Sequence, residues 1–358
     1  MKLLLLFPFI AAYFFSNAQS SSQPVIRLTD SVQCTNVKDQ SQSPTCWAFG
    51  TNSLFESDIL KITGKRLNLS EMFIARYAYI DKINMFLATR GKTYCEGGGQ
   101  FHDVLRVIDR YGIVPEDAYP GRPNGESSHN HAELDTTMKE FMYDLLEQGK
   151  TELSGDDLRR VNKILDQYLG KVPQTFWYDL KDHTPKTFAK EIMPSTSDYV
   201  ELMSFPDLPY YKKCLLVDRF NWANDSICNI PLTDFQMLID TALAKGWSVG
   251  WEGDVTNEGF NSFGGLASTN TTYQTYDAIR PKNYADLTTE RDHMLHIVGI
   301  GKDENNKKWY YLKNSWGTWL SKYKGYLYMD ENYFRLNTVI VMTNKAGLPE
   351  ALKRKLGL

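Results

Sequence analysis

The chain has 358 residues, of which 42% are hydrophobic, 23% charged and 13% aromatic. This composition is typical of a globular protein, and the aromatic content excludes an intrinsically disordered chain. The formal net charge of −3 gives no basis for a nucleic-acid-binding or anionic-membrane-binding protein.

The first 18 residues have the features of a signal peptide. Lys2 precedes an apolar run over residues 3–15, and Ser16-Asn17-Ala18 places small residues where signal peptidase reads them. The run is shorter than the roughly 20 residues of a membrane-spanning helix. We therefore expect cleavage after Ala18, an exported (periplasmic or secreted) mature domain over residues 19–358, and no membrane span after signal removal.

Helical patterns dominate the first half of the mature chain. Pro44 suits the first turn of a helix, apolar residues recur at helical spacing as far as Ile62, and Gly64 ends the run. Ser70 opens a second predicted helix, and residues 100–111 form a third with Val104, Leu105, Val107 and Ile108 on its inner face.

Residues 133–170 carry two more apolar stripes at helical spacing, and no catalytic motif follows either stripe. We interpret residues 121–190 as a helical insertion packed on the domain. The last third of the chain reads instead as strands separated by turns, over residues 247–251, 295–300, 309–312, 325–329 and 339–343. Helices first and sheet last predict an α+β protein with two lobes.

Four residues form a candidate catalytic set. Cys46 lies at a predicted helix N-terminus, whose partial positive charge favours the thiolate that a cysteine nucleophile needs. His293 is the candidate imidazolium that lowers the thiol pKa further and later protonates the leaving amine. Asn314 can hold the imidazole in one tautomer, and Gln40 can direct its amide N–H to the oxyanion beside the N–H of Cys46.

Two further residues, Trp316 and His296, lie close in sequence to this set. Trp316 is expected to cover the hydrogen bond between His293 and Asn314 from water. His296 follows His293 by three positions, so on a strand the two side chains point to opposite faces and only one of them can meet Cys46.

The surroundings of Cys46, His293 and Asn314 resemble the papain superfamily. Ser43 stands where the local papain signature has a second cysteine, and the gap from Cys46 to His293 far exceeds the roughly 130 to 150 residues usual in papain-like enzymes. In both features the sequence resembles the bleomycin hydrolase and bacterial aminopeptidase C group. The resemblance extends over about residues 30–350 and includes residues 69–73, 97–103, 110–115, 169–176, 247–254 and 314–329.

The resemblance implies a papain-like two-lobe fold, with a helical lobe and an antiparallel, β-barrel-like lobe. It implies a cysteine peptidase that removes N-terminal residues from peptides through a thioester acyl-enzyme, with peptides as partners and possibly a homohexamer. It also implies that Gly98, Gly99, Asp292 and Trp316 belong to the substrate site. In that group the chain's own C-terminal arm lies in the cleft and presents its carboxylate to the substrate's amino group.

The tail of this sequence leaves the specificity open. Only residues 351–358 follow Glu350, and they include Lys353, Arg354 and Lys355. A short basic tail favours, as an alternative, an endopeptidase. A non-catalytic peptide-binding protein and a transferase or amide hydrolase with the same acyl-enzyme are further alternatives. No cluster has metal-ligand spacing, so neither a metal nor an organic cofactor is expected.

The four other cysteines have two interpretations. In an oxidising compartment they could form two disulfides, although their spacings show no compact framework. They could equally be free core thiols, which the spacings favour. These residues are Cys34, Cys95, Cys214 and Cys228.

Overall fold

The structure is a computed structural model that describes residues 23–271, 276–319 and 321–358. The predicted signal peptide lies outside these residues. Within the described ranges, no helix is both long and apolar enough to cross a membrane.

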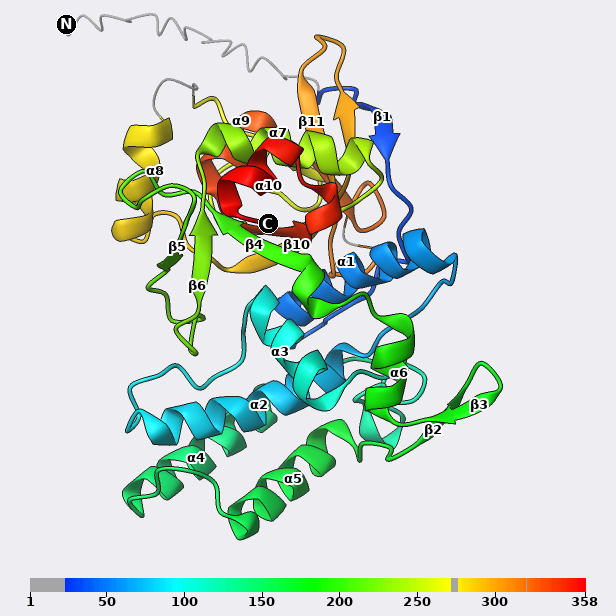
Figure 1. Cartoon of the computed structure of the whole chain (residues 1–358), viewed down its shortest axis with the longest axis vertical. Helices are drawn as coiled ribbons and strands as arrows, with labels where there is room; N and C mark the ends of the chain where they lie inside the picture. The colour runs from blue at the N-terminus through cyan, green and yellow to red at the C-terminus, as the bar shows by residue number, and fades with distance from the viewer. Residues whose placement is uncertain (1–22, 272–275, 320) are drawn as a thin grey trace, which may run out of the picture.

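The chain forms a helical lobe and a sheet lobe, which Figure 1 shows one below the other. The helical lobe holds the predicted second and third helices and the helices of the predicted insertion. Its elements are α2 (Glu71–Ala88), α3 (Phe101–Tyr111), α4 (Ala132–Glu147), α5 (Gly155–Leu169), the hairpin β2 (Phe176–Tyr178) and β3 (Lys181–His183), and α6 (Pro185–Ile192). The division of residues 121–190 into a separate insertion stays a prediction.

The helix boundaries follow local capping chemistry. The hydroxyl of Ser70 accepts a hydrogen bond from the backbone N–H of Phe73 at 3.1 Å, so Ser70 caps α2 as predicted. In α4, Met138, Phe141, Met142 and Leu145 are buried, which confirms the inner stripe of that helix. In α5, Val161, Leu165 and Leu169 of the predicted stripe are buried, whereas Leu158, its first member, is exposed.

The sheet lobe is built on one large, mostly antiparallel sheet. Its strand order is β5-β6-β4-β13-β7-β10-β11-β12-β9-β8, with β1 paired to β10. The five predicted strands correspond to β7 (Val249–Gly253), β10 (His293–Lys302), β11 (Lys308–Lys313), β12 (Tyr326–Asp330) and β13 (Thr338–Asn344).

The remaining strands are short and were not predicted from the sequence. They are β1 (Arg27–Ser31), β4 (Tyr199–Met203), β5 (Lys212–Leu215), β6 (Ser226–Asn229), β8 (Phe260–Asn261) and β9 (Leu266–Ala267). The helices of this lobe were also not predicted: α7 (Leu232–Ala244), α8 (Tyr276–Ala285), α9 (Glu331–Asn337) and α10 (Glu350–Leu356). Together with the predicted elements they confirm an α+β fold.

Helix α1 (Cys46–Thr63) lies between the two lobes and is buried on all sides over Trp47–Ile59. A Cβ added at Gly50 would lie 3.1 Å from the Cβ of Met294, so α1 packs closely against β10. Ile62 was predicted to face inward but is 54% exposed, because the last turn of α1 extends beyond the core. Gly64 ends the helix in the left-handed conformation, as predicted.

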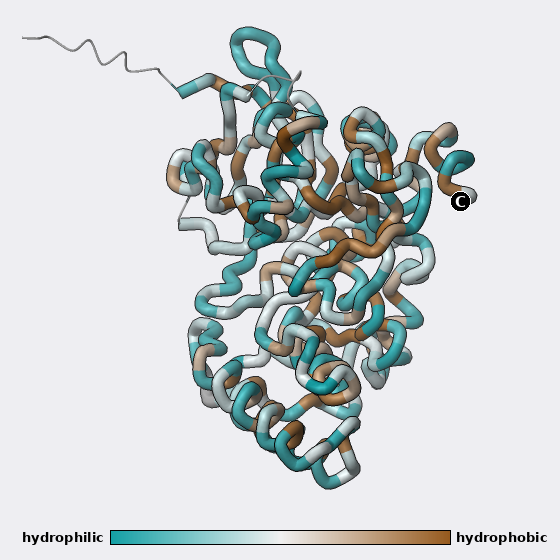
Figure 2. The backbone as a smooth tube through the Cα atoms, turned by 90° about the vertical axis from the view of Figure 1, so that its left-hand side faces the viewer, coloured by the Kyte–Doolittle hydropathy of each residue, from teal (hydrophilic) through white to brown (hydrophobic). Residues whose placement is uncertain are grey.

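The sheet separates two hydrophobic cores. Met294 belongs to the core on the α1 side, whereas Leu295 and Ile297 belong to the core that α7, α9 and α10 cover. This alternation is the period of two expected for a strand buried on both faces. In the hydropathy colouring of Figure 2, hydrophobic stretches lie mainly in the interior of the molecule and hydrophilic ones on the outer turns.

Candidate active site

Cys46 is the first residue of α1 and is partly exposed, although the rest of the first turns is buried. The backbone N–H groups of Ala48 and Phe49 both donate to the carbonyl of Thr45, at 2.9 and 3.1 Å. The thiol therefore lies at a helix N-terminus, as predicted, where the helix dipole favours negative charge.

His293, Asn314 and Trp316 lie together at the edge of the sheet lobe. The Nε2 atom of His293 is 2.8 Å from the Oδ1 atom of Asn314. The Trp316 ring lies on the imidazole, with ring centroids 4.5 Å apart. His293 is 4% exposed, so the hydrogen bond is sheltered as predicted. Because Asn314 Oδ1 is an acceptor, His293 donates from Nε2 and leaves Nδ1 as the reactive nitrogen.

His296 has a different environment from His293. Its Nδ1 atom is 2.8 Å from the hydroxyl of Ser53 in α1, and the ring is fully buried. Along β10 the even-numbered Met294 and His296 face α1, whereas Leu295 and Ile297 face the opposite core. The two histidines thus occupy opposite faces, and His293 is the one beside Asn314.

Gln40 connects the loop before Cys46 to the loop that carries Asn314. Its backbone N–H donates to the Ser315 carbonyl at 2.8 Å, and its Oε1 atom accepts from the Ser315 hydroxyl at 2.7 Å. Its Nε2 atom donates to the Ser43 carbonyl at 3.0 Å. The second N–H of this amide is the one that could reach an oxyanion. Ser43, in place of the papain-like cysteine, closes this loop by donating to the Gln40 carbonyl at 2.7 Å.

Burial shifts the pKa values of Cys46 and His293 in the directions that favour their neutral forms. Burial, with the nearby carboxylates of Glu252 and Asp292, raises the pKa of Cys46 to about 12, against the backbone contacts of Met294 and Trp47. Burial also lowers the pKa of His293 to about 4, although the bond to Asn314 opposes this. Burial thus favours the neutral forms of both groups in the free site, and the thiolate–imidazolium pair expected from the sequence stays a prediction.

The glycine-rich turn lies directly against the loop that carries Cys46. The Gly98 N–H donates to the Pro44 carbonyl at 2.9 Å, and the Gly98 carbonyl accepts from the Lys82 ammonium. A Cβ at Gly99 would lie 2.8 Å from the Trp47 ring. Both polar backbone groups of Gly98 are thus used within the protein. Substrate binding by Gly98 and Gly99 stays a prediction.

Asp292 immediately precedes His293. Its Oδ1 atom accepts from the Val255 N–H at 3.0 Å, while Oδ2 is buried without a hydrogen-bond partner among the described residues. Burial raises the pKa of Asp292 to about 6. A half-buried carboxylate with a free oxygen beside the nucleophile is consistent with the predicted substrate contact, which stays a prediction.

Sequence reasoning missed a second group of charged residues beside Cys46. Glu252 on β7 is paired in register with Met294, and its Oε1 atom lies 3.3 Å from the Nε atom of Arg291. Arg291 in turn forms an ion pair with Asp218. These residues are far apart in sequence, and although Glu252 lies in the segment 247–254 of the resemblance, no role was predicted for it. The only signal was the position of Arg291, two residues before His293.

The structure leaves all five cysteines unpaired. Cys95 is buried and the other four are partly exposed. Within the described part of the chain, no group of three or more His, Cys, Asp or Glu side chains could hold a metal ion.

Comparisons with known proteins agree with this geometry. The model of the Peptidase C1-like family matches residues 11–357. Aminopeptidase C of Lactobacillus delbrueckii subsp. lactis is 26% identical over 89% of this chain and 81% of its own length. Bleomycin hydrolase of Mus musculus is 23% identical over 88% of this chain and 81% of its own length. The crystal structure of PepW from Lactobacillus rhamnosis HN001 has the same fold, with a TM-score of 0.74 at 21% identity over 92% of this chain and 84% of that one.

Proposed function

We propose that this protein removes residues from the N-termini of peptides through a thioester on Cys46. The chain belongs to the Peptidase C1-like family, in the aminopeptidase C and bleomycin hydrolase group of the papain superfamily, and is a cysteine-type peptidase. One observation carries this proposal. The His293–Asn314 hydrogen bond lies beneath Trp316, and the Cys46 thiol, at the start of α1, contacts the backbone of Met294, the residue after His293.

The geometry supports an acyl transfer in two halves. The Cys46 thiol gives its proton to Nδ1 of His293, and the thiolate sulfur attacks the scissile carbonyl carbon. The resulting thiolate and imidazolium stabilise each other, which offsets the burial that keeps both neutral in the free site.

The tetrahedral oxyanion is received by the Cys46 backbone N–H and the free N–H of Gln40. The imidazolium protonates the amine as the C–N bond breaks, and a thioester remains. Water, deprotonated by His293, then attacks the thioester and releases the acid and the thiol.

Two observations bear on which peptide bonds are cleaved. The relatives named aminopeptidase C support attack at the N-terminus. The C-terminal helix α10, however, packs on the α7 side of the sheet, with Leu352 in that core and Lys355 3.4 Å from Asp234. No described contact brings residues 350–358 to Cys46. This position favours the endopeptidase alternative, unless other residues restrict the cleft.

The proposed chemistry is tested with Cys46→Ala. We expect kcat/KM on peptides with a free N-terminus to fall at least about 10⁴-fold, because the acyl-enzyme cannot form. Circular dichroism and thermal melting would show that the variant is folded. Peptide cleavage by folded Cys46→Ala at a rate within tenfold of wild type would overturn the proposal, and would favour a protein that only binds peptides.

Export is also part of the proposal. It rests on Lys2, the apolar run over residues 3–15 and the small residues before Gln19. Expression of the full chain in a secreting bacterial host should give a protein outside the cytoplasm whose N-terminus is Gln19. An uncleaved protein that stays in the cytoplasm would contradict export. The hexamer expected from the resemblance stays a prediction, which sedimentation equilibrium can check.

A further inference from the structure

The loop between β5 and β6, residues 216–225, covers the glycine-rich turn beside Cys46. A Cβ added at Gly98 would lie 2.8 Å from two atoms of the Phe220 ring. The same ring packs edge-on against Tyr94, with centroids 5.3 Å apart. Because the Gly98 N–H is bonded to the carbonyl of Pro44, Phe220 is separated from the start of α1 by a single layer of backbone.

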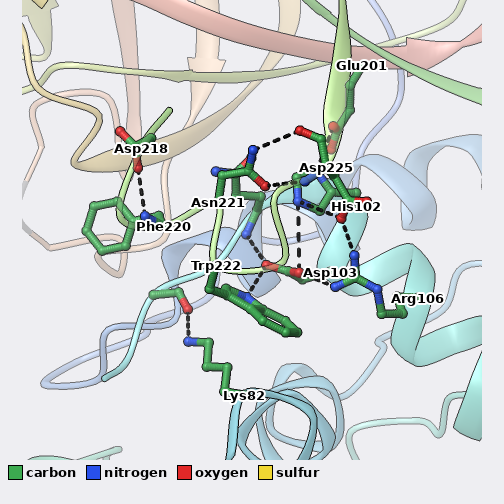
Figure 3. Close-up of polar contacts among 12 residues, drawn as sticks. Lys82, His102, Asp103, Arg106, Glu201, Asp218, Phe220, Asn221, Trp222 and Asp225 are labelled. Atoms are coloured by element: carbon green, nitrogen blue, oxygen red, sulfur yellow. Dashed lines mark hydrogen bonds and ion pairs between the residues drawn. The ribbon is translucent and has the colours of Figure 1, made fainter. Parts of the chain in front are cut away.

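The first end of this loop is held by a buried ion pair. Asp218 pairs with Arg291, whose side chain is completely buried, and also accepts from the Tyr284 hydroxyl at 3.1 Å. The other Asp218 contact is internal: its Oδ1 atom accepts from the Phe220 N–H at 2.7 Å, as Figure 3 shows. Phe220 is thus tied to Arg291, two residues before His293.

The second end is held by helix α3. Asp225 pairs with Arg106 and lies 3.5 Å from Nε2 of His102. Between the two ends, the Trp222 indole N–H donates to Asp103 at 2.9 Å. Figure 3 shows these contacts converging on the start of α3.

The loop is also closed within itself. The Asn221 side chain donates to the carbonyls of Leu216 at 3.0 Å and Asp225 at 2.8 Å. It also accepts from the Asp225 N–H at 2.9 Å. Hydrogen bonds at both ends and across the middle hold the loop in one conformation beside the glycine-rich turn.

The order of the strands indicates which part of a bound substrate lies against this loop. His293 lies on β10, with β11 on one side and β7 on the other. Asn314 and Trp316 follow β11, so the leaving amine, which His293 protonates, departs on the β11 side. The acyl part must then extend toward β7, where Glu252 lies opposite Met294.

Glu252 is a buried carboxylate with one oxygen still free. Its residue is 3% exposed and it points to the α1 side of the sheet, since Trp251 belongs to the opposite core. Oε1 faces Arg291, whereas Oε2 has no hydrogen-bond partner among the described residues. Burial raises the pKa of Glu252 to about 8, although Arg291 opposes this, so an arriving cation beside the free Oε2 oxygen would stabilise the charged carboxylate.

We infer that Phe220 closes the acyl side of the cleft and that Glu252, with its free Oε2 oxygen, receives the α-ammonium of the substrate. This inference rests on the proposed peptidase function and deepens it. The β5–β6 loop and β7 restrict the enzyme to N-termini, a role that α10 cannot fill from where it packs. A substrate whose amine is acetylated loses the ion pair and brings its acetyl group against Phe220.

The test compares Phe220→Ala and Glu252→Gln with Val217→Ala, an outward-facing residue of the same loop that is 82% exposed. Each protein is assayed on an aminoacyl-coumarylamide with a free amine and on its N-acetyl counterpart. We expect wild type and Val217→Ala to prefer the free amine at least about 100-fold. Phe220→Ala should lower the ratio of kcat/KM on the free-amine substrate to kcat/KM on the acetylated substrate at least tenfold, because it gains activity on the acetylated substrate.

Glu252→Gln should lower the ratio about tenfold or more by raising KM for the free-amine substrate. The rate at which iodoacetamide alkylates Cys46 shows that each variant keeps its site, and Phe220→Leu replaces Phe220→Ala if the latter does not fold. Unchanged ratios in both variants would overturn the inference. A wild type that cleaves neither substrate nor any free peptide would instead overturn the proposed function.

Discussion

The two sides of the cleft are built in different ways. The leaving-group side, with His293, Asn314 and Trp316, depends on one hydrogen bond and one ring contact between segments that end neighbouring strands. The acyl side depends on ion pairs among residues from β4, β7, α3 and the β5–β6 loop.

This difference separates chemistry from specificity. The leaving-group side holds groups that any cysteine peptidase of this mechanism needs, in a geometry that leaves few alternatives. The acyl side needs only to exclude longer chains and to favour an amine, which many arrangements of side chains could do. Changes on the first side should therefore abolish the reaction, whereas changes on the second should alter which peptides react.

The largest expected effect is on the leaving-group side, with His293→Ala. It removes both the general base and the general acid, so kcat/KM should fall about 10³-fold or more. The matched control is His296→Gln, three residues along the same strand, where the histidine contacts the Ser53 hydroxyl and not Asn314. Its activity per folded molecule should stay within about threefold of wild type. Equal losses in the two variants would show that the assignment of the catalytic histidine is wrong.

On the acyl side, the main effect of Asp218→Asn should be a lower free energy of unfolding rather than a lower rate of cleavage. It leaves the fully buried Arg291 without a full counter-charge, and breaking such a pair costs on the order of 3 to 5 kcal/mol. Urea denaturation followed by fluorescence measures the change in the free energy of unfolding. Asp207→Asn, at an exposed position, should change it by no more than about 0.5 kcal/mol. A loss in Asp218→Asn no larger than this control would mean that the loop is not held by the ion pair.

The smallest effect should come from His102, which holds the far end of the loop. Burial lowers the pKa of His102, but the carboxylates of Glu201, Asp103 and Asp225 raise it to about 9 overall, above the ordinary value of 6.5. The stability from the charged imidazole is therefore complete below about pH 6.5 and is lost as the pH rises through 9. We expect wild type to lose on the order of 1 to 3 kcal/mol across this interval.

The control for that pH dependence is His102→Gln, which keeps a hydrogen-bonding side chain without the titrating charge. The difference in unfolding free energy between the two proteins should shrink between pH 6.5 and 9. A constant difference across this range would contradict a charged His102 in the folded state.

The contrast between the two sides also explains what the sequence could predict. Cys46, His293, Asn314 and Gln40 could be identified because their chemistry demands fixed residue types in a fixed order. The strands β7 and β10–β13 could be identified because burial of both faces gives continuous apolar runs. The short strands β4, β5 and β6 could not, because their pairing depends on distant neighbours rather than on local pattern.

The residues of the acyl side could not be predicted from the sequence, because their contacts also depend on distant neighbours rather than on local pattern. Glu252 sits in an apolar strand and Arg291 at the start of another, and either alone suggests an ordinary surface charge. Only the register of β7 against β10 and the path of the β5–β6 loop bring them together with Asp218. The pKa of Cys46 also could not be anticipated, because the burial that raises it comes from both lobes.

Mapping the cleavage products of a peptide about ten residues long by mass spectrometry tests the central claim most directly. An enzyme whose cleft is open on the Trp316 side and closed at Phe220 should release residues from the free N-terminus only, in order along the chain. The N-acetylated form of the same peptide should remain intact. Internal fragments from either form, produced by wild type but not by Cys46→Ala, would contradict the closed acyl side and establish an endopeptidase.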